Sequence, residues 1–171
     1  MRKFVFVLLP LLCAHAAAPK KELQALTDQA RALPPEFAAD VLLKLAVSPL
    51  ATDAKWQQEL IDDAFLSAGH APMHYLQIGD AEAAWGELSS SRMSAMTLQT
   101  RAIEAMRLLD PQRAVTLFQN LGTPELPTLS CRQPHTPDLS AYYATAAILF
   151  TQSFTPAQRQ KFERMLQESQ R

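Results

Sequence analysis

The sequence predicts an all-α fold in which antiparallel helix hairpins form a short α-solenoid or an irregular helical bundle. Apolar residues recur every three to four positions along most of the chain, which is the spacing of one face of an α-helix. Glycine occurs only four times, and the twelve prolines fall mostly between the apolar stretches. No run has the alternation and the Val, Ile and Thr content of a strand, so we expect roughly seven or eight helices and no strands.

Residues 1–16 have the order of a secretory signal peptide. Two basic residues come first, residues 4–12 are apolar, and the small pair Ala14 and Ala16 predicts cleavage after Ala16. A membrane anchor is less favoured, because a bilayer span needs about 20 apolar residues and this run has about half that number. We therefore expect a periplasmic or secreted protein with no stable membrane span after cleavage, in which residues 17–171 form a single all-helical domain.

The chain is mildly acidic and has no basic block. Its formal charge is −1 at pH 7, and removal of Arg2 and Lys3 with the signal peptide takes it to −3. A nucleic-acid partner is disfavoured, because phosphate contacts need clustered Lys and Arg. Cleavage also leaves Cys131 without a second cysteine, so no internal disulfide can stabilise the domain. Stability must therefore come from packing.

Three helices are predicted in the first part of the chain. The first spans about 20–32, and the Pro-Pro pair at 34–35 ends it and begins the second. Thr52 or Asp53 caps the third helix, which Gly69 ends. The apolar stripes expected to face the core are Leu23, Leu26, Ala30 and Leu33, then Phe37, Val41, Leu42 and Leu45, then Trp56, Leu60, Ile61, Ala64 and Phe65.

The middle of the chain holds one interrupted stretch and two strong helices. The helical pattern fails over 70–79, and Asp80 is expected to cap a short helix that runs to residue 88. The next helix covers about 92–109 and is apolar on two sides, so we expect it to lie between neighbouring helices. A cap and a first-turn proline at 110–111 start a further helix, which Gly122 ends.

A long Pro-rich loop is predicted at 122–138, before the last two helices. Loops of this length are uncommon in compact domains and are often functional. Asp138 then opens a helix, and Thr155 and Gln158 have the spacing of a capping box at the start of the last one.

Two resemblances agree with a helical-repeat architecture. Residues 108–111 (LLDP), set between two helices, resemble the repeat boundary of tetratricopeptide proteins, although Met106 and Gln99 stand where that family has small residues. The chain also resembles a group of uncharacterised, exported bacterial helical proteins, which implies a Gram-negative periplasmic or secreted setting and no known activity. That second resemblance is carried by residues 33–40, 98–114, 129–131 and 140–143.

Four residues are candidate metal ligands. His70 and His74 are four apart, and so are Cys131 and His135. Thiolate and imidazole ligands suit zinc, and the two pairs could complete a four-ligand site. Pro72 lies between the first two, and no Glu follows His70, so the zinc-protease motif is absent. The simpler interpretation is loop histidines and a buried cysteine.

Aromatic and acidic residues offer further possibilities. Aromatic side chains can line a ligand groove, but at helical spacing they usually pack in the core. The acidic residues Glu59, Asp62 and Asp63 are interpreted as a solvated helix face. The aromatic candidates are Trp56, Trp85, Tyr142, Tyr143, Phe150 and Phe154, and the methionine stripe expected in the core is Met93, Met96 and Met106.

No catalytic motif, phosphate loop or dinucleotide fingerprint occurs, and no cofactor is implied. The sequence therefore favours a non-enzymatic, exported helical-repeat protein that binds a protein or peptide partner in the cell envelope. The alternative is a protein that binds a metal through His70, His74, Cys131 and His135, or a small ligand in an aromatic-lined groove. An enzyme whose site has no sequence motif is a third possibility.

Overall fold

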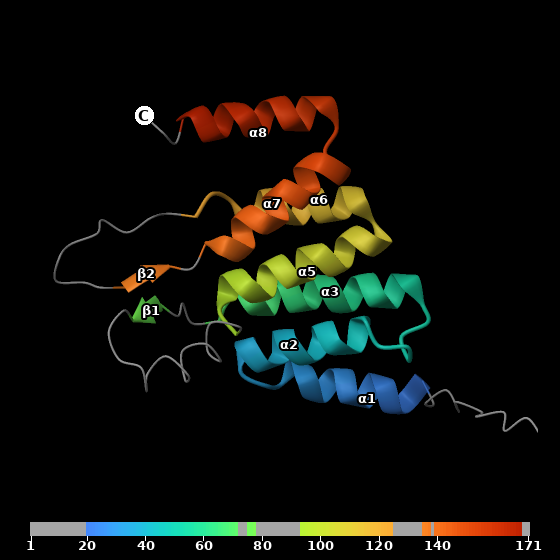
Figure 1. Ribbon diagram of the computed structural model, residues 1–171. Helices are drawn as coiled ribbons and strands as arrows, with labels where there is room; N and C mark the ends of the chain where they lie inside the picture. The colour runs from blue at the N-terminus through green and yellow to red at the C-terminus, as the bar shows by residue number, and fades with distance from the viewer. Residues whose placement is uncertain (1–19, 72–74, 78–92, 125–134, 138, 169–171) are drawn as a thin grey trace, which may run out of the picture.

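A computed structural model describes residues 20–71, 75–77, 93–124, 135–137 and 139–168. The expectation of an all-α fold is confirmed (Figure 1). The predicted signal peptide, the short helix expected at 80–88 and most of the 122–138 loop lie outside the described residues. The helices in the described part are α1 (Lys20–Arg31), α2 (Pro35–Ala46), α3 (Ala54–Gly69), α5 (Ala95–Leu109), α6 (Pro111–Leu121), α7 (Ser140–Gln152) and α8 (Pro156–Glu168).

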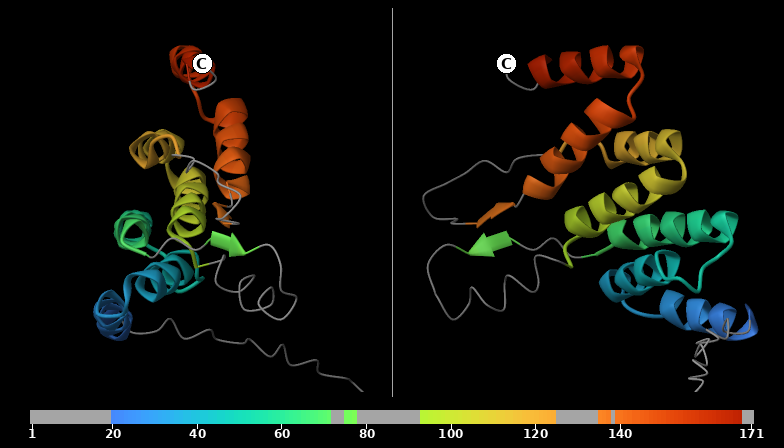
Figure 2. Two further views of the ribbon diagram at one scale, coloured as in Figure 1. Left: turned by 90° about the vertical axis from the view of Figure 1, so that its left-hand side faces the viewer. Right: turned by 45° about the vertical axis from the view of Figure 1, so that its right-hand side comes forward.

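The helices alternate in direction and stack in chain order from α1 at one end to α8 at the other (Figure 1). Seen end-on, they zigzag between two layers, with α2, α5 and α7 in one layer and α1, α3 and α6 in the other (Figure 2). Each helix from α1 to α5 packs on the next along the chain, and α5 packs on α6. Within the first layer, α5 also contacts α2 and α7. These contacts are those of helix hairpins laid side by side.

Helix α5 occupies the centre of this stack. It contacts α2, α3, α6 and α7. Leu98, Ala102, Ile103 and Met106 are fully buried. The prediction that this helix is apolar on two sides and lies between neighbours is therefore confirmed.

The predicted N-cap residues Asp53 and Asp110 cap the helices that follow them. The Asp53 carboxylate accepts hydrogen bonds from the backbone N–H groups of Lys55 and Trp56 at the start of α3. Asp110 does the same for Gln112 and Arg113, with Pro111 in the first turn of α6. These caps satisfy helix N–H groups that have no partner within the helix.

Two further end signals are also confirmed. Thr155 and Gln158 form the reciprocal pair of a capping box, in which the Thr155 N–H donates to Gln158 Oε1 at 2.7 Å. Gly122 ends α6 with a φ of 72°, a conformation that favours glycine. Gly69 is the last residue of α3, as predicted, but it lacks the positive φ of Gly122. A Cβ at Gly69 would lie 3.2 Å from Gln99 Nε2, so its small size serves close packing against α5.

The apolar stripes predicted for α1 and α2 are partly wrong. Leu26, Leu33 and Phe37 are exposed, whereas Thr27 is buried and donates its hydroxyl to the Leu23 carbonyl. The reason why the α1 stripe is not fully buried is the position of α1 in the stack. Helix α1 is the first of the stack and packs on α2 alone among the larger helix contacts, so it can bury only a narrow face.

One structural feature differs from the expectation of no strands. Strand β1 (Tyr75–Gln77) pairs antiparallel with β2 (His135–Pro137), and Gln77 lies opposite His135. This ribbon joins the two interrupted stretches of the sequence (Figure 1). A three-residue strand is too short to show a period of two, and its pairing depends on a partner about 60 residues away.

The Asp110 cap allows α5 to be followed by α6 without a loop. Replacing Asp110 by Ala should lower the free energy of unfolding by about 1 kcal/mol, because two backbone N–H groups lose their acceptor. Urea unfolding followed by circular dichroism measures the change. Asp28→Ala, which removes only exposed side-chain contacts, is the control and should cost less than about 0.5 kcal/mol. Equal losses in both variants would contradict the role of the cap.

Candidate functional site

The predicted metal ligands are only partly within the described residues. His70 follows the last residue of α3 and is exposed. His135 lies in β2, opposite Gln77 of β1. His74 and Cys131 lie outside the described residues. Among the described side chains, no three His, Cys, Asp or Glu residues are grouped so that they could hold a metal ion. The four-ligand site therefore stays a prediction.

The aromatic residues form core packing in the region where α6, α7 and α8 meet. The Phe118 ring stacks on Tyr142 with centroids 5.0 Å apart and also contacts Phe154 and Phe162. Tyr142, Phe118 and Phe154 are buried, whereas Tyr143 is exposed. The core interpretation is confirmed for Tyr142 and Phe154. Trp85 lies outside the described residues.

The acidic face of α3 contributes to packing between helices. Asp63 pairs with Arg31 of α1, and Asp62 pairs with Arg113 of α6 at 3.1 Å. All four side chains keep a substantial exposed fraction, as a solvated face predicts. Partly exposed pairs of this kind contribute little to stability, and nothing here resembles an acid–base dyad.

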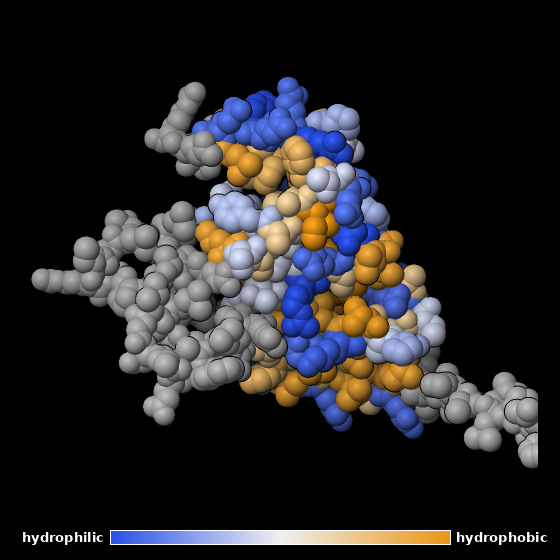
Figure 3. Space-filling model, viewed as in Figure 1, coloured by the Kyte–Doolittle hydropathy of each residue, from blue (hydrophilic) through white to orange (hydrophobic). Residues whose placement is uncertain are grey.

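A hollow between α2 and α5, which we call the α2–α5 groove, is a candidate site that the sequence did not reveal. Its volume is about 340 Å³. Its two helices belong to the layer formed by α2, α5 and α7 (Figure 2), and hydrophilic and hydrophobic side chains lie side by side on the face of the molecule shown in Figure 3. The groove is lined by Leu43 and Lys44 from α2, by Val47, which directly follows α2, and by Arg101, Glu104, Ala105, Arg107 and Leu108 from α5.

Cations outnumber acids in this lining. Lys44, Arg101 and Arg107 face a single acidic residue, Glu104, among the lining side chains. The Glu104 carboxylate accepts a hydrogen bond of 3.0 Å from the Thr145 hydroxyl of α7. The groove is thus locally positive in a chain whose formal charge is −1.

Asp40 connects the two helices that form the groove. Its carboxylate is buried, and its two oxygens lie 2.6 Å from Lys44 Nζ and 2.9 Å from Arg101 Nη1. Burial alone would raise the pKa of Asp40, but hydrogen bonds and charge from Lys44 and Arg101 outweigh it and hold this pKa below its ordinary value. The carboxylate therefore stays ionised at neutral pH and positions the charged groups of Lys44 and Arg101.

Arg107 is held differently from the other two cations. Its Nη1 donates to the side-chain oxygen of Gln152 in α7 at 2.9 Å. Its Nε is buried and has no hydrogen-bond partner among the described residues. Within the described residues Arg107 forms no ion pair, although Glu104 lies three positions before it on the same side of α5, so its guanidinium can still bind an anionic group.

The sequence did not predict this site, because its charged residues have the pattern expected of any solvent-exposed helix face. The spacing of Arg101, Glu104 and Arg107 places them on one side of α5, and that signal was present. The sequence does not show which segment lies beside α5. Lys44 and Val47, from the C-terminal end of α2, are more than 50 positions earlier in the chain.

Comparison with protein families, with curated proteins and with solved structures finds no match to this chain. Within the described residues, no helix combines the length and the apolar character needed to cross a lipid bilayer.

Replacing Asp40 by Asn should lower the free energy of unfolding by about 1–3 kcal/mol at pH 7, since Lys44 and Arg101 lose the negative charge between them and one of the two acceptor oxygens becomes an NH2 donor. The folded-state pKa of Asp40 is depressed, so its contribution is present above the unfolded value of about 3.9 and is lost as the pH falls through the folded value. The gap between the two proteins should therefore begin to narrow below about pH 4 and close only below the folded-state pKa.

Urea unfolding at pH 7 and at pH 3 measures this gap. Asp28→Asn, in an exposed position on α1, is the matched control and should show little effect at either pH. A gap that stays constant with pH would mean that the Asp40 carboxylate contributes through packing and not through its charge.

Proposed function

We propose that the protein is an exported, non-enzymatic helical-repeat protein that binds a peptide segment of a partner in the cell envelope through the α2–α5 groove. The observation that carries this proposal is the pair of exposed apolar side chains at the groove. Val47, at the C-terminal end of α2, is 65% exposed, and Leu108 of α5 is 74% exposed. Single exposed apolar residues are ordinary, but two that line one hollow from two helices make a contact surface.

The size of the groove supports a peptide as the occupant. A volume of about 340 Å³ lies at the lower end of the range for ligand sites, and it accommodates a few side chains of an extended segment. The helices on both sides of the groove belong to one packed layer, so its shape is largely preformed. A preformed surface reduces the entropy lost on binding.

The lining supports binding over catalysis. Its polar groups are three cations and Glu104, whose carboxylate accepts a hydrogen bond from Thr145. Among the described lining residues there is no Ser, Cys or His that could act as a nucleophile or general base. This composition fits recognition of a ligand by charge and apolar contact.

Val47→Asp and Leu108→Asp should each abolish capture of the envelope partner, because a carboxylate replaces an apolar contact. Pull-down from an envelope extract, followed by titration of the purified partner, measures the effect. Both positions are exposed, so each variant should stay within about 0.5 kcal/mol of the parent in stability.

The matched control is Leu66→Asp. Leu66 is also 65% exposed, but it belongs to α3 in the other layer and does not line the groove. Retention of the partner by Leu66→Asp and loss by both groove variants supports the proposal. Loss of the partner in all three variants, or in none, contradicts it.

A zinc site is the second candidate, because the β1–β2 ribbon brings together the two stretches that carry its predicted ligands. His135 lies opposite Gln77 at one end of the ribbon, whereas His74 directly precedes Tyr75 at the other end, so a shared site would need a ligand to reach along the ribbon. The backbone pairing thus joins two of the stretches that carry predicted ligands. Cys131 is four residues before His135 in the chain.

Under this second proposal, the purified mature protein should carry one zinc ion per chain, and a chelator should lower its melting temperature. Elemental analysis and thermal unfolding measure both. His135→Ala and Cys131→Ala should lose the metal, whereas the control Lys161→Ala should keep it. Protein purified without chelator that contains no stoichiometric zinc would exclude this candidate.

A further inference from the structure

We infer that the α2–α5 groove selects an acidic peptide, one in which Asp or Glu residues stand next to apolar residues. This inference rests on the proposed function and adds the chemical class of the ligand. It follows from the charges of the groove, from the unmatched guanidinium of Arg107 and from the pairing of cations with apolar side chains on both helices.

The first argument is charge complementarity. Lys44, Arg101 and Arg107 line the groove, and Glu104 is the single acid beside them. Asp40 neutralises part of this charge from its buried position, but the Lys44 side chain remains 69% exposed and that of Arg101 remains 40% exposed. An ammonium group has three donors and a guanidinium has five, so both heads keep donors for a ligand.

The second argument concerns Arg107. Lys44 and Arg101 share the Asp40 carboxylate, whereas the contact described for Arg107 is with the neutral amide of Gln152. Its buried Nε has no partner among the described residues. Because Nε is buried, a ligand carboxylate would replace Gln152 at the two terminal nitrogens, where it would form two parallel charged hydrogen bonds in place of one neutral contact. An acidic residue of the peptide should therefore bind more favourably at Arg107 than at Lys44 or Arg101.

The third argument is the pairing of charge with apolar surface. Lys44 is in the last turn of α2 and Val47 is the residue that follows the helix, and both line the groove. On α5, Leu108 follows Arg107 and lines the same groove. Each side of the groove thus offers one cation and one exposed apolar side chain. A segment in which acidic and apolar residues are close together complements both sides.

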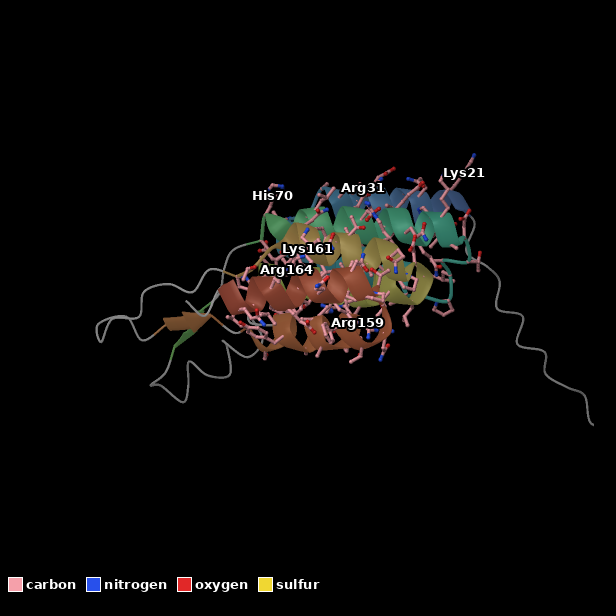
Figure 4. The ribbon with its side chains drawn as sticks, turned by 90° about the horizontal axis from the view of Figure 1, so that it is seen from above. Lys21, Arg31, His70, Arg159, Lys161 and Arg164 are labelled. Carbon is pink, nitrogen blue, oxygen red and sulfur yellow. The ribbon has the colours of Figure 1, made fainter. Side chains whose placement is uncertain are left out.

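Other cations provide the controls, because they come from other parts of the stack. Lys21 and Arg31 belong to α1, and Arg159, Lys161 and Arg164 belong to α8 (Figure 4). Helix α8 lies at the far end of the stack from α2 (Figure 1). Lys161 carries the same charge as the groove cations and lies outside the groove, so it reports on overall charge alone.

The test is selection from a random library of twelve-residue peptides displayed on phage, with the immobilised mature chain as bait. Enriched peptides should carry Asp or Glu within a few residues of Leu, Ile, Val or Phe. They should not be enriched on a Val47→Asp/Leu108→Asp double variant. Enrichment of neutral or basic peptides that still need Val47 and Leu108 would overturn the inference and leave the proposed function standing. If no peptide distinguishes the parent from the double variant, the proposed function itself fails.

Affinity measurements then test the role of each charge. A labelled peptide from the selection should bind at least about tenfold more tightly than its twin with Asn and Gln in place of Asp and Glu, and more weakly as salt rises. Arg107→Gln should weaken binding of the acidic peptide by about tenfold and leave the amide twin unchanged. Lys161→Gln should change neither. Two results would show that Arg107 does not bind a peptide carboxylate. One is an equal effect of Arg107→Gln on both peptides. The other is a loss of affinity for the acidic peptide in Lys161→Gln as large as that in Arg107→Gln.

Discussion

Helix α5 has apolar side chains on two sides, and both sides must be covered for the chain to fold. Ile103 and Met106 are fully buried, and so are Leu98 and Ala102. Contacts with α2, α3, α6 and α7 provide that cover. Because an apolar surface left in water is unfavourable roughly in proportion to its area, this one helix requires neighbours in both layers. The zigzag stack is the arrangement that supplies them.

The same helix also determines where the groove lies. Its remaining face carries Arg101, Glu104 and Arg107, which line the groove. Arg101 pairs with Asp40 of α2, whereas Glu104 and Arg107 make hydrogen bonds with Thr145 and Gln152 of α7. These polar contacts hold three helices of one layer together. They also leave a positive, partly apolar hollow on one side of α5 in a chain of slightly negative charge.

The candidate site shows which features of a surface the sequence could not reveal. Motif searching pointed to His70, His74, Cys131 and His135, because spaced histidines and cysteines are recognisable wherever they occur. A groove of Lys, Arg and Val residues has no such signature. Each of these residues is ordinary on an exposed helix face, and they become a site only when two helices place them together. The antiparallel ribbon is a similar case, since its strands are too short to be recognised separately.

The sequence by itself determined the features that depend on residues within about one helical turn. The caps at Asp53 and Asp110, the capping box at Thr155 and the end of α6 at Gly122 are local contacts, and the helical period follows from the backbone. Tertiary structure alone decided which of the apolar residues on α1 and α2 are buried and where the groove lies. The Asp40–Arg101 pair spans 61 residues, and Phe37 of the predicted α2 stripe is exposed. Such outcomes depend on which surfaces meet in space, and a periodic pattern along one helix can indicate that neighbours cover it but not which helices they are.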